Sequence, residues 1–327
     1  MALKPRSHSG WYTLMAIRPI AVLGLLTAVP QWLVAQAVPP LDQLAIRLAA
    51  MTAVSGYERA MGDTLLTLLP GATRDRVGNI VLTLGAGEPR ILVACPIDEP
   101  GLVVGGIRPD GYLTLRRVGP SPGPLADQQL EGQRVTVFGR SGPIPGVVGV
   151  RSVHLTRGRS MGDTPFTFDD AYLDVGADSA AQVARLGIEV LSPVARAKEP
   201  TRYGDTLLAA PVAGRRAAMA ALLLAARATR AARGTVMVAF VVEQSFTRRG
   251  LLSIVRTKGP FAQTLLIDPS AAAGSPGGNA APDPDLPSKP ELWGLGLRYP
   301  GTPVETVSLQ EAERLELKLR ARLGGGE

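Results

Sequence analysis

The sequence of 327 residues is poor in the side chains that make crosslinks and metal sites, with one cysteine and two histidines. Because a disulfide needs two cysteines, the single thiol of Cys95 excludes any intrachain disulfide. Beyond the first 37 residues the only histidine is His154. The size of the core must therefore stabilise the fold, without crosslinks.

Aromatic residues are also scarce, at 5% of the chain, so the core must consist mainly of Ala, Val and Leu. The formal net charge is +7, but the basic residues form no runs interleaved with aromatics. Scattered charge of this kind is typical of a solvated surface, so we expect no nucleic-acid partner. With 46% hydrophobic residues, the chain can fill a large core in one or two domains.

The N-terminal segment has the pattern of an export signal. Arg18 precedes an apolar run at 19–29, and Ala35-Gln36-Ala37 fits a signal-peptidase site. We therefore expect residues 1–37 to be a signal peptide, with Met15 as an alternative start, and the mature protein to be periplasmic or extracellular in a bacterium. The apolar run is short for a transmembrane span, so we expect no membrane partner unless the segment stays uncleaved as an anchor.

After the signal, the hydrophobic pattern alternates between helix and strand. Helices are expected at 41–51, 55–69, 215–230 and 308–323, and a further helix begins at 251. Ser55 is the expected cap of the second helix. Strands are expected within 75–84 and at 90–94, 235–242 and 264–267. The Gly- and Pro-rich stretch 271–290 is predicted to be a flexible loop. The pattern predicts an α/β domain.

Residues 102 to about 200 differ in texture from the rest. Short alternating runs, such as 112–115, 134–138 and 146–150, are separated by Gly and Pro clusters. One short helix is expected from Ser179 to Leu186, stopped by Gly187. The sequence therefore predicts an all-β unit inserted into the α/β domain.

Several motifs in order resemble one enzyme family. They are Thr52-Ala-Val-Ser-Gly-Tyr-Glu58, Arg76-Val-Gly-Asn-Ile80, the segment 94–101, Gly132–Val137, Asp174–Ser179, Glu243-Gln244, Ile267-Asp268 and Arg298-Tyr299. Their order and spacing resemble the tetrahedral-particle (deblocking or glutamyl) metallo-aminopeptidases, family forty-two of the metallopeptidases, over most of 41–305.

The resemblance implies a phosphorylase/hydrolase-like mixed sheet with flanking helices, of the zinc-aminopeptidase type. This α/β domain would comprise 38–102 and 204–327. The inserted all-β domain of dimerisation type would comprise 103–203, and we expect homo-oligomers through it. Family members carry more chain between the position of Asp268 and the Arg-Tyr segment, so part of the sheet edge and of the substrate wall should be missing here.

The resemblance also implies five ligand positions for two metal ions. The first histidine falls on Pro96, the bridging aspartate on Gly214, the glutamate on Gln244 and the final histidine on Gly301. Only the second aspartate is retained, as Asp268. Because zinc takes about three or four protein ligands, we expect no metal cofactor. Cys95 is expected to be a buried small residue and His154 a surface or packing residue.

Two further residues match the family's catalytic positions. Glu243 matches the general base and Asp98 the residue that orients the first histidine, so both would be vestigial. A capping or ion-paired role for Glu243 and a turn cap for Asp268 are the alternatives. Arg215 and Arg216 stand beside the lost bridging position. We hypothesise that one guanidinium replaces the metal charge by pairing with Glu243 or Asp268, against the alternative of two solvated arginines.

Three functions are compatible with these residues. The first is an exported, catalytically inactive aminopeptidase homologue that binds peptides or acts as a scaffold. The second is an active metallo-aminopeptidase with a rebuilt site, which would bring zinc or cobalt, or a hard cation among Asp98, Glu243 and Asp268. The third is a structural or interaction module that acts through the β insertion. The sequence favours the first.

Overall fold

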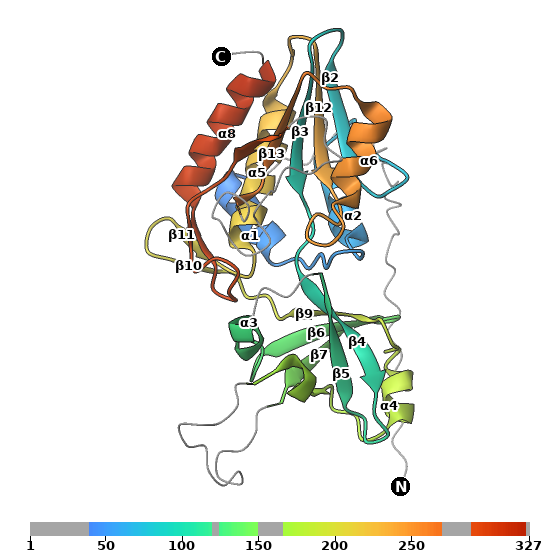
Figure 1. Cartoon of the computed structure of the whole chain (residues 1–327). Coiled ribbons are helices and arrows are strands. Elements are labelled where there is room, and N and C mark those ends of the chain that lie inside the picture. The colour runs from blue at the N-terminus through green and yellow to red at the C-terminus, as the bar shows by residue number, and fades with distance from the viewer. Residues whose placement is uncertain (1–38, 120–123, 150–165, 270–288, 325–327) are drawn as a thin grey trace, which may run out of the picture. The chain divides into compact units, whose positions relative to one another are not determined.

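The computed structural model describes residues 39–119, 124–149, 166–269 and 289–324 (Figure 1). The expected signal peptide, His154 and most of the expected loop at 271–290 lie outside the described residues. Within the described ranges, no helix is both long and apolar enough to cross a membrane.

The described helices alternate with strands along the chain. The helices are α1 Leu41–Ala49, α2 Arg59–Leu68, α3 Pro124–Gln128, α4 Ala180–Arg185, α5 Ala213–Ala228, α6 Arg249–Lys258 and α8 Leu309–Gly324, with a 3-10 turn at Phe168–Asp170. The strands up to the end of the insertion are β1 Thr73–Arg74, β2 Ile80–Gly85, β3 Arg90–Pro96, β4 Gly101–Ile107, β5 Leu113–Val118, β6 Arg134–Gly139, β7 Gly142–Val148, β8 Leu173–Asp174 and β9 Pro193–Arg196. The remaining strands are β10 Thr201–Tyr203, β11 Leu207–Ala209, β12 Thr235–Val241, β13 Gln263–Ile267, β14 Glu291–Trp293, β15 Leu297–Arg298 and β16 Thr306–Ser308.

A mixed six-stranded sheet forms the centre of the α/β part, in the order β1-β2-β12-β3-β13-β14. Strands β12, β3, β13 and β14 run parallel, whereas β2 pairs antiparallel with β12. Side chains of β3 alternate between two cores. Val93 and Cys95 pack with α1, α2, α5 and α8, while Leu92 and Ala94 pack with α6. Burial of both faces explains why β3 is almost continuously apolar.

Helix α5 is the central helix of this core, and its Ala-rich sequence explains how. Its residues from Ala213 to Leu223 are all buried, and it packs on α1, α8 and β3. Small side chains allow neighbouring helices to approach on several sides at once. The same helix carries Arg215 and Arg216 in its first turn, so it buries two cations inside the domain.

The inserted unit is a closed antiparallel barrel in the order β4-β5-β8-β7-β6-β9. Inward-facing residues such as Val104, Leu115, Val137 and Val194 fill its core. Its strands extend from Gly101 to Arg196, and α4 closes with Gly187 at φ +75° as the sequence predicts. The mixed α/β fold is thus present in the structure, and the barrel follows β3 and precedes β10 in chain order.

The sequence pattern did not predict a small second sheet. Strands β10, β11, β16 and β15 form a four-stranded antiparallel sheet, although none has more than three residues. Strands this short give no readable alternation, and β10 is exposed along its whole length. The edge strand of the large sheet, β14, is also short, with three residues.

The predicted cap of the second helix was wrong. Helix α2 begins at Arg59, with Glu58 at its N-cap and no side-chain capping bond. The hydroxyl of Ser55 instead donates to Asp98 Oδ2. A long-range buried acceptor thus outcompetes the local capping role, which the sequence pattern could not show.

Candidate functional site

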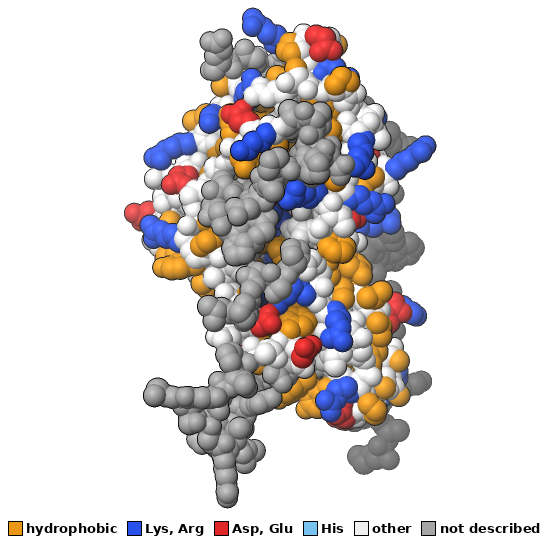
Figure 2. Space-filling model, in the orientation of Figure 1, with side chains coloured by type: hydrophobic (Ala, Val, Ile, Leu, Met, Phe, Trp, Pro, Cys, Tyr) orange, Lys and Arg blue, Asp and Glu red, His pale blue; other side chains and the backbone are white. Residues whose placement is uncertain are grey.

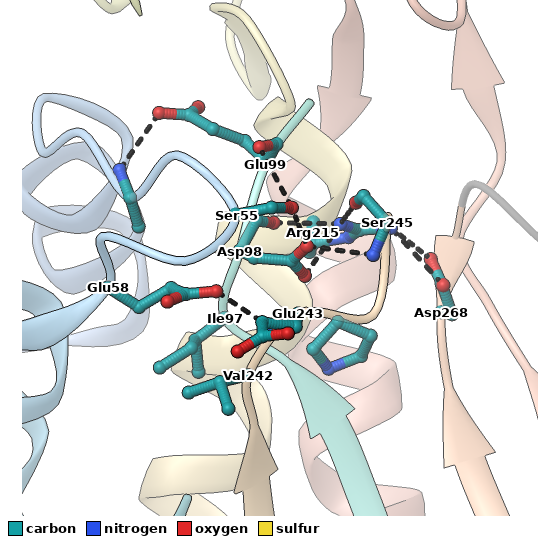
Figure 3. Close-up of polar contacts among 12 residues, drawn as sticks. Ser55, Glu58, Ile97, Asp98, Glu99, Arg215, Val242, Glu243, Ser245 and Asp268 are labelled. Carbon is teal, nitrogen blue, oxygen red and sulfur yellow. Dashed lines mark hydrogen bonds and ion pairs between the residues drawn. The ribbon is translucent and has the colours of Figure 1, made fainter. Parts of the chain in front are cut away.

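The candidate site lies where β3, β12 and β13 end and where α5 begins (Figure 3). Asp98 follows β3, Ser245 follows β12, Asp268 follows β13, and Arg215 is in the first turn of α5. Because these strands are parallel, their carboxyl ends meet at one edge of the sheet, which is the usual position of a site in such folds.

Arg215 is the centre of this cluster. Its Nη1 donates to the carbonyl oxygen of Asp98 at 2.7 Å and lies 3.4 Å from Asp98 Oδ1. The same nitrogen lies 2.8 Å from Ser245 Oγ. Its Nη2 lies 3.2 Å from Asp268 Oδ2 and 3.3 Å from Asp268 Oδ1. The structure thus brings together three residues that the sequence singled out, with a guanidinium between two carboxylates.

Because these charged side chains are buried, each destabilises the fold unless an opposite charge lies close to it. The side chains of Arg215 and Asp268 are each 6% exposed and that of Asp98 is fully buried. Burial by itself would lower the pKa of Arg215, but Asp268 and Asp98 outweigh it and raise that pKa. Asp98 is held further by the Ser245 N–H at 2.7 Å and by the Ser55 hydroxyl. The guanidinium is therefore permanently charged and compensates two buried acids.

Arg216 forms a second buried cluster one residue along α5. Its Nη2 lies 3.3 Å from Glu99 Oε2, and its Nη1 donates to the Ile97 carbonyl at 2.5 Å. Glu99 Oε2 also pairs with Lys198. Burial would raise the pKa of Glu99, but Lys198 and Arg216 together lower it. Burial lowers the pKa of Lys198 to about 8.

Glu243 lies outside the Arg215 cluster. Its Oε1 pairs with the exposed Arg249 at 3.2 Å, and its Oε2 accepts from the Thr247 hydroxyl at 2.9 Å. Its own backbone has φ +53°, and its N–H donates to Glu58 Oε1. Burial raises the pKa of that Glu58 carboxyl. The structure therefore places Glu243 in an ion pair of its own loop, and Arg215 pairs with Asp268 rather than with Glu243.

Glu305 is a buried acid that no motif of the sequence indicates as a site residue. Its Oε1 accepts from the Gly214 N–H and its Oε2 from the Gly301 N–H, both at 3.0 Å. These are two of the positions at which the resemblance implies metal ligands. Burial raises the pKa of Glu305, which also lies near enough to Arg215 and Asp268 to respond to their charges. A single carboxylate thus ties the start of α5 to the turn before β16.

The residues present do not fit the two-metal centre that the resemblance implies. Pro96 and Gly301 offer no ligand atom, and Gly301 has φ +74°, which a side chain would strain. Gly214 itself has no ligand atom, and a Cβ there would lie 2.4 Å from Leu297 Cδ2, so a larger residue would require the Leu297 side chain to move. The buried Gln244 Oε1 has no hydrogen-bond partner among the described residues, but a neutral amide is a weak ligand.

The acids that remain are already occupied. Asp98 and Asp268 are held by Arg215, and Glu305 by two backbone N–H groups. In the described ranges, no group of three or more His, Cys, Asp or Glu side chains is arranged to hold a metal ion.

Cys95 adds nothing to the site. It is fully buried in the core with Val93 and Ile97, and burial raises the pKa of its thiol. A thiol that stays protonated is a poor nucleophile and a poor metal ligand.

The comparisons with known proteins agree with the fold and the motifs. The model of the M42 glutamyl aminopeptidase family matches residues 78–276, which is more than half of the chain. The SgcX protein of Escherichia coli (strain K12) is 32% identical over 228 residues, covering 67% of this chain and 60% of that protein. Lysyl aminopeptidase of Pyrococcus furiosus is 29% identical over 202 residues, covering 60% and 57%. The chain thus spans at most about 60% of the length of these relatives.

Solved structures are similar in fold over more of the chain. An aminopeptidase from the archaeon Desulfurococcus kamchatkensis has a TM-score of 0.75 at 19% identity, covering 88% of this chain and 95% of that one. The TET1 peptidase of Pyrococcus horikoshii, which can assemble into a tetrahedron or a large octahedral shell, has a TM-score of 0.75 at 20% identity, covering 87% and 99%. With the family model, the ordered motifs and this fold in agreement, the chain belongs to the M42 glutamyl aminopeptidase family.

Proposed function

We propose that this chain is an aminopeptidase homologue that does not hydrolyse peptides and that acts by binding peptides or by holding partner chains. The observation that carries the proposal is the Arg215 guanidinium between Asp98 and Asp268. A fixed cation there compensates the acids that a metal pair would otherwise hold, so no metal ion is needed for charge balance.

The surroundings of Glu243 support the same proposal. A general base in this family would act on water activated by metal, and the ligand positions here are Pro96, Gly214, Gln244 and Gly301. Glu243 is instead engaged by Arg249 and Thr247. Without an activated water, this carboxylate would supply little catalysis.

Metal analysis combined with a hydrolysis assay tests the proposal. The full chain is purified without chelators, its zinc, cobalt and manganese are measured, and release of N-terminal amino acids from peptides is followed. We expect no stoichiometric metal. We also expect the wild type, Glu243→Gln and the matched surface change Glu313→Gln to give the same background release of amino acids. Near-stoichiometric metal together with activity that is lost only in Glu243→Gln would overturn the proposal.

We further propose that the protein is exported and self-associates through the barrel. Export follows from the signal-peptide pattern of residues 1–37, and N-terminal sequencing of protein from the periplasm should give a sequence that begins near Val38.

Self-association is suggested by the assemblies of the TET1 peptidase. Size-exclusion chromatography with light scattering should give a mass above one chain, and a monomer at all concentrations would contradict it. Retention of peptide without turnover would favour peptide binding over a scaffold role.

A further inference from the structure

A concave surface lies between β14 and α8, and none of its lining residues belongs to the Arg215 cluster. The groove has a volume of about 370 Å³, and among its lining residues are Leu292, Trp293, Leu295, Arg314 and Lys318. The side chains of Leu295 and Leu315 are buried at its base. Figure 2 shows Lys and Arg side chains, with some Asp and Glu, over the upper left of the molecule, where α8 lies in Figure 1.

One wall of the groove is the edge of β14 that no other described strand pairs with. Among the described residues, β14 pairs only with β13, in parallel register with Ile267 opposite Trp293. The carbonyl of Trp293 accepts from the Asp268 N–H, so the backbone of Trp293 faces β13. Successive residues of a strand direct their backbone groups to opposite sides. The N–H and C=O of Leu292 therefore face away from β13, toward the open edge.

The acids near this edge are engaged within the protein. Glu291 accepts from Gln263 Nε2 at 2.7 Å and from Trp293 Nε1 at 2.6 Å. Glu311 Oε2 accepts from the Gly296 N–H at 3.0 Å. These bonds hold the two carboxylates in the walls of the groove, and both carboxylates keep their negative charge because the donors are neutral.

Two cations lie on the α8 wall of the groove. Arg314 and Lys318 are one helical turn apart on α8, so they share a face, and both are exposed. Lys318 Nζ lies 3.7 Å from the centre of the Trp293 ring, and no carboxylate of the described ranges pairs with either cation. The groove thus combines an apolar base, a strand edge that no other described strand pairs with, and two cations without an ion-pair partner in the described ranges.

We propose that this groove is a docking site for an extended, acidic segment of a partner protein. The segment would add to the edge of β14 through hydrogen bonds to Leu292, with apolar side chains toward Leu295 and carboxylates toward Arg314 and Lys318. Strand addition of this kind gains affinity from main-chain bonds and specificity from alternate side chains. A nucleic acid would meet Arg314 and Lys318 but could not use the strand edge. The proposal does not depend on whether the chain hydrolyses peptides.

Fluorescence anisotropy of the full chain tests this docking. The probe is a fluorescein-labelled peptide of alternating glutamate and valine, compared with the same peptide carrying lysine in place of glutamate and with a version N-methylated along its backbone. We expect saturable binding of the first peptide only. Arg314→Glu should weaken it about tenfold, because it removes an attraction and adds a repulsion. Arg185→Glu on α4, an equal charge reversal of another exposed helical arginine, should leave it unchanged.

Four outcomes would overturn the docking proposal. The first is an absence of saturable binding, and the second is equal weakening by Arg185→Glu and Arg314→Glu. The third is equal affinity for the N-methylated peptide or equally strong competition by single-stranded DNA, which would mark the surface as a general polyanion site. The fourth is a change of oligomeric state in Arg314→Glu without peptide binding to the wild type, which would make a second copy of the chain the occupant. Circular dichroism confirms that each variant is folded.

Discussion

Replacing Arg215 by methionine should destabilise the protein strongly. Methionine keeps most of the aliphatic volume but removes the charge that compensates Asp98 and Asp268. Breaking a buried ion pair by removing one partner costs about 3–5 kcal/mol, because the remaining charge stays buried. The partners here are at most 6% exposed, so solvent screening offers little relief. We therefore expect the free energy of unfolding to fall by about 3–5 kcal/mol.

The chain provides a matched control for this change. Arg249 pairs with Glu243 at 3.2 Å, the same distance as that between Arg215 and Asp268, but the Arg249 side chain is 62% exposed. Exposed pairs contribute only about 0–1 kcal/mol. Arg249→Met should therefore change stability by less than about 1 kcal/mol. Urea unfolding followed by far-ultraviolet circular dichroism gives both values.

A second variant separates charge from packing. In Arg215→Met/Asp268→Asn one of the two buried negative charges is gone, so part of the lost stability should return. If Arg215→Met costs no more than Arg249→Met, the guanidinium does not compensate buried acids and the reasoning fails. If adding Asp268→Asn lowers stability further, the loss comes from packing rather than from charge.

Three further outcomes are expected. Glu305→Gln should cost about 1–3 kcal/mol, because an amide cannot accept from both glycine N–H groups and leaves one unpaired; Glu313→Gln on the exposed face of α8 should cost almost nothing in the same urea assay. The pKa of Lys198 is lowered from its usual 10.5 to about 8 by burial, so between these values the unfolded chain binds the proton more tightly and stability rises with pH. The stability of the wild type relative to Lys198→Met should therefore increase from pH 8 to 10.5, and a flat difference would contradict this. Cys95 should react with a thiol reagent only as the protein unfolds, and rapid labelling of the native protein would refute its burial.

Most of the large elements of the fold could be predicted from the sequence. The buried run of β3, the Ala-rich pattern of α5 and the alternating segments of the barrel follow from local periodicity, so the α/β domain and its β insertion could be predicted. The second sheet could not, because β10, β11, β15 and β16 are too short to show a period. The cap at Ser55 was mispredicted for a related reason: its hydroxyl binds Asp98, which is distant in sequence.

For the candidate site, too, the sequence predicted one part, and only the structure showed the other. The sequence alone determined that Pro96, Gly214, Gln244 and Gly301 stand where the resemblance implies metal ligands, because side-chain identity is independent of the fold. It left open whether Arg215 was solvated or paired.

Only the tertiary structure decided that question, because the partners of Arg215 come from three different strand ends. It also revealed Glu305, whose two hydrogen bonds reach Gly214 and Gly301 across 91 and four positions of the chain. Compensation of buried charge depends on distances through space, and those distances are fixed only when the strand ends of the sheet meet the first turn of α5.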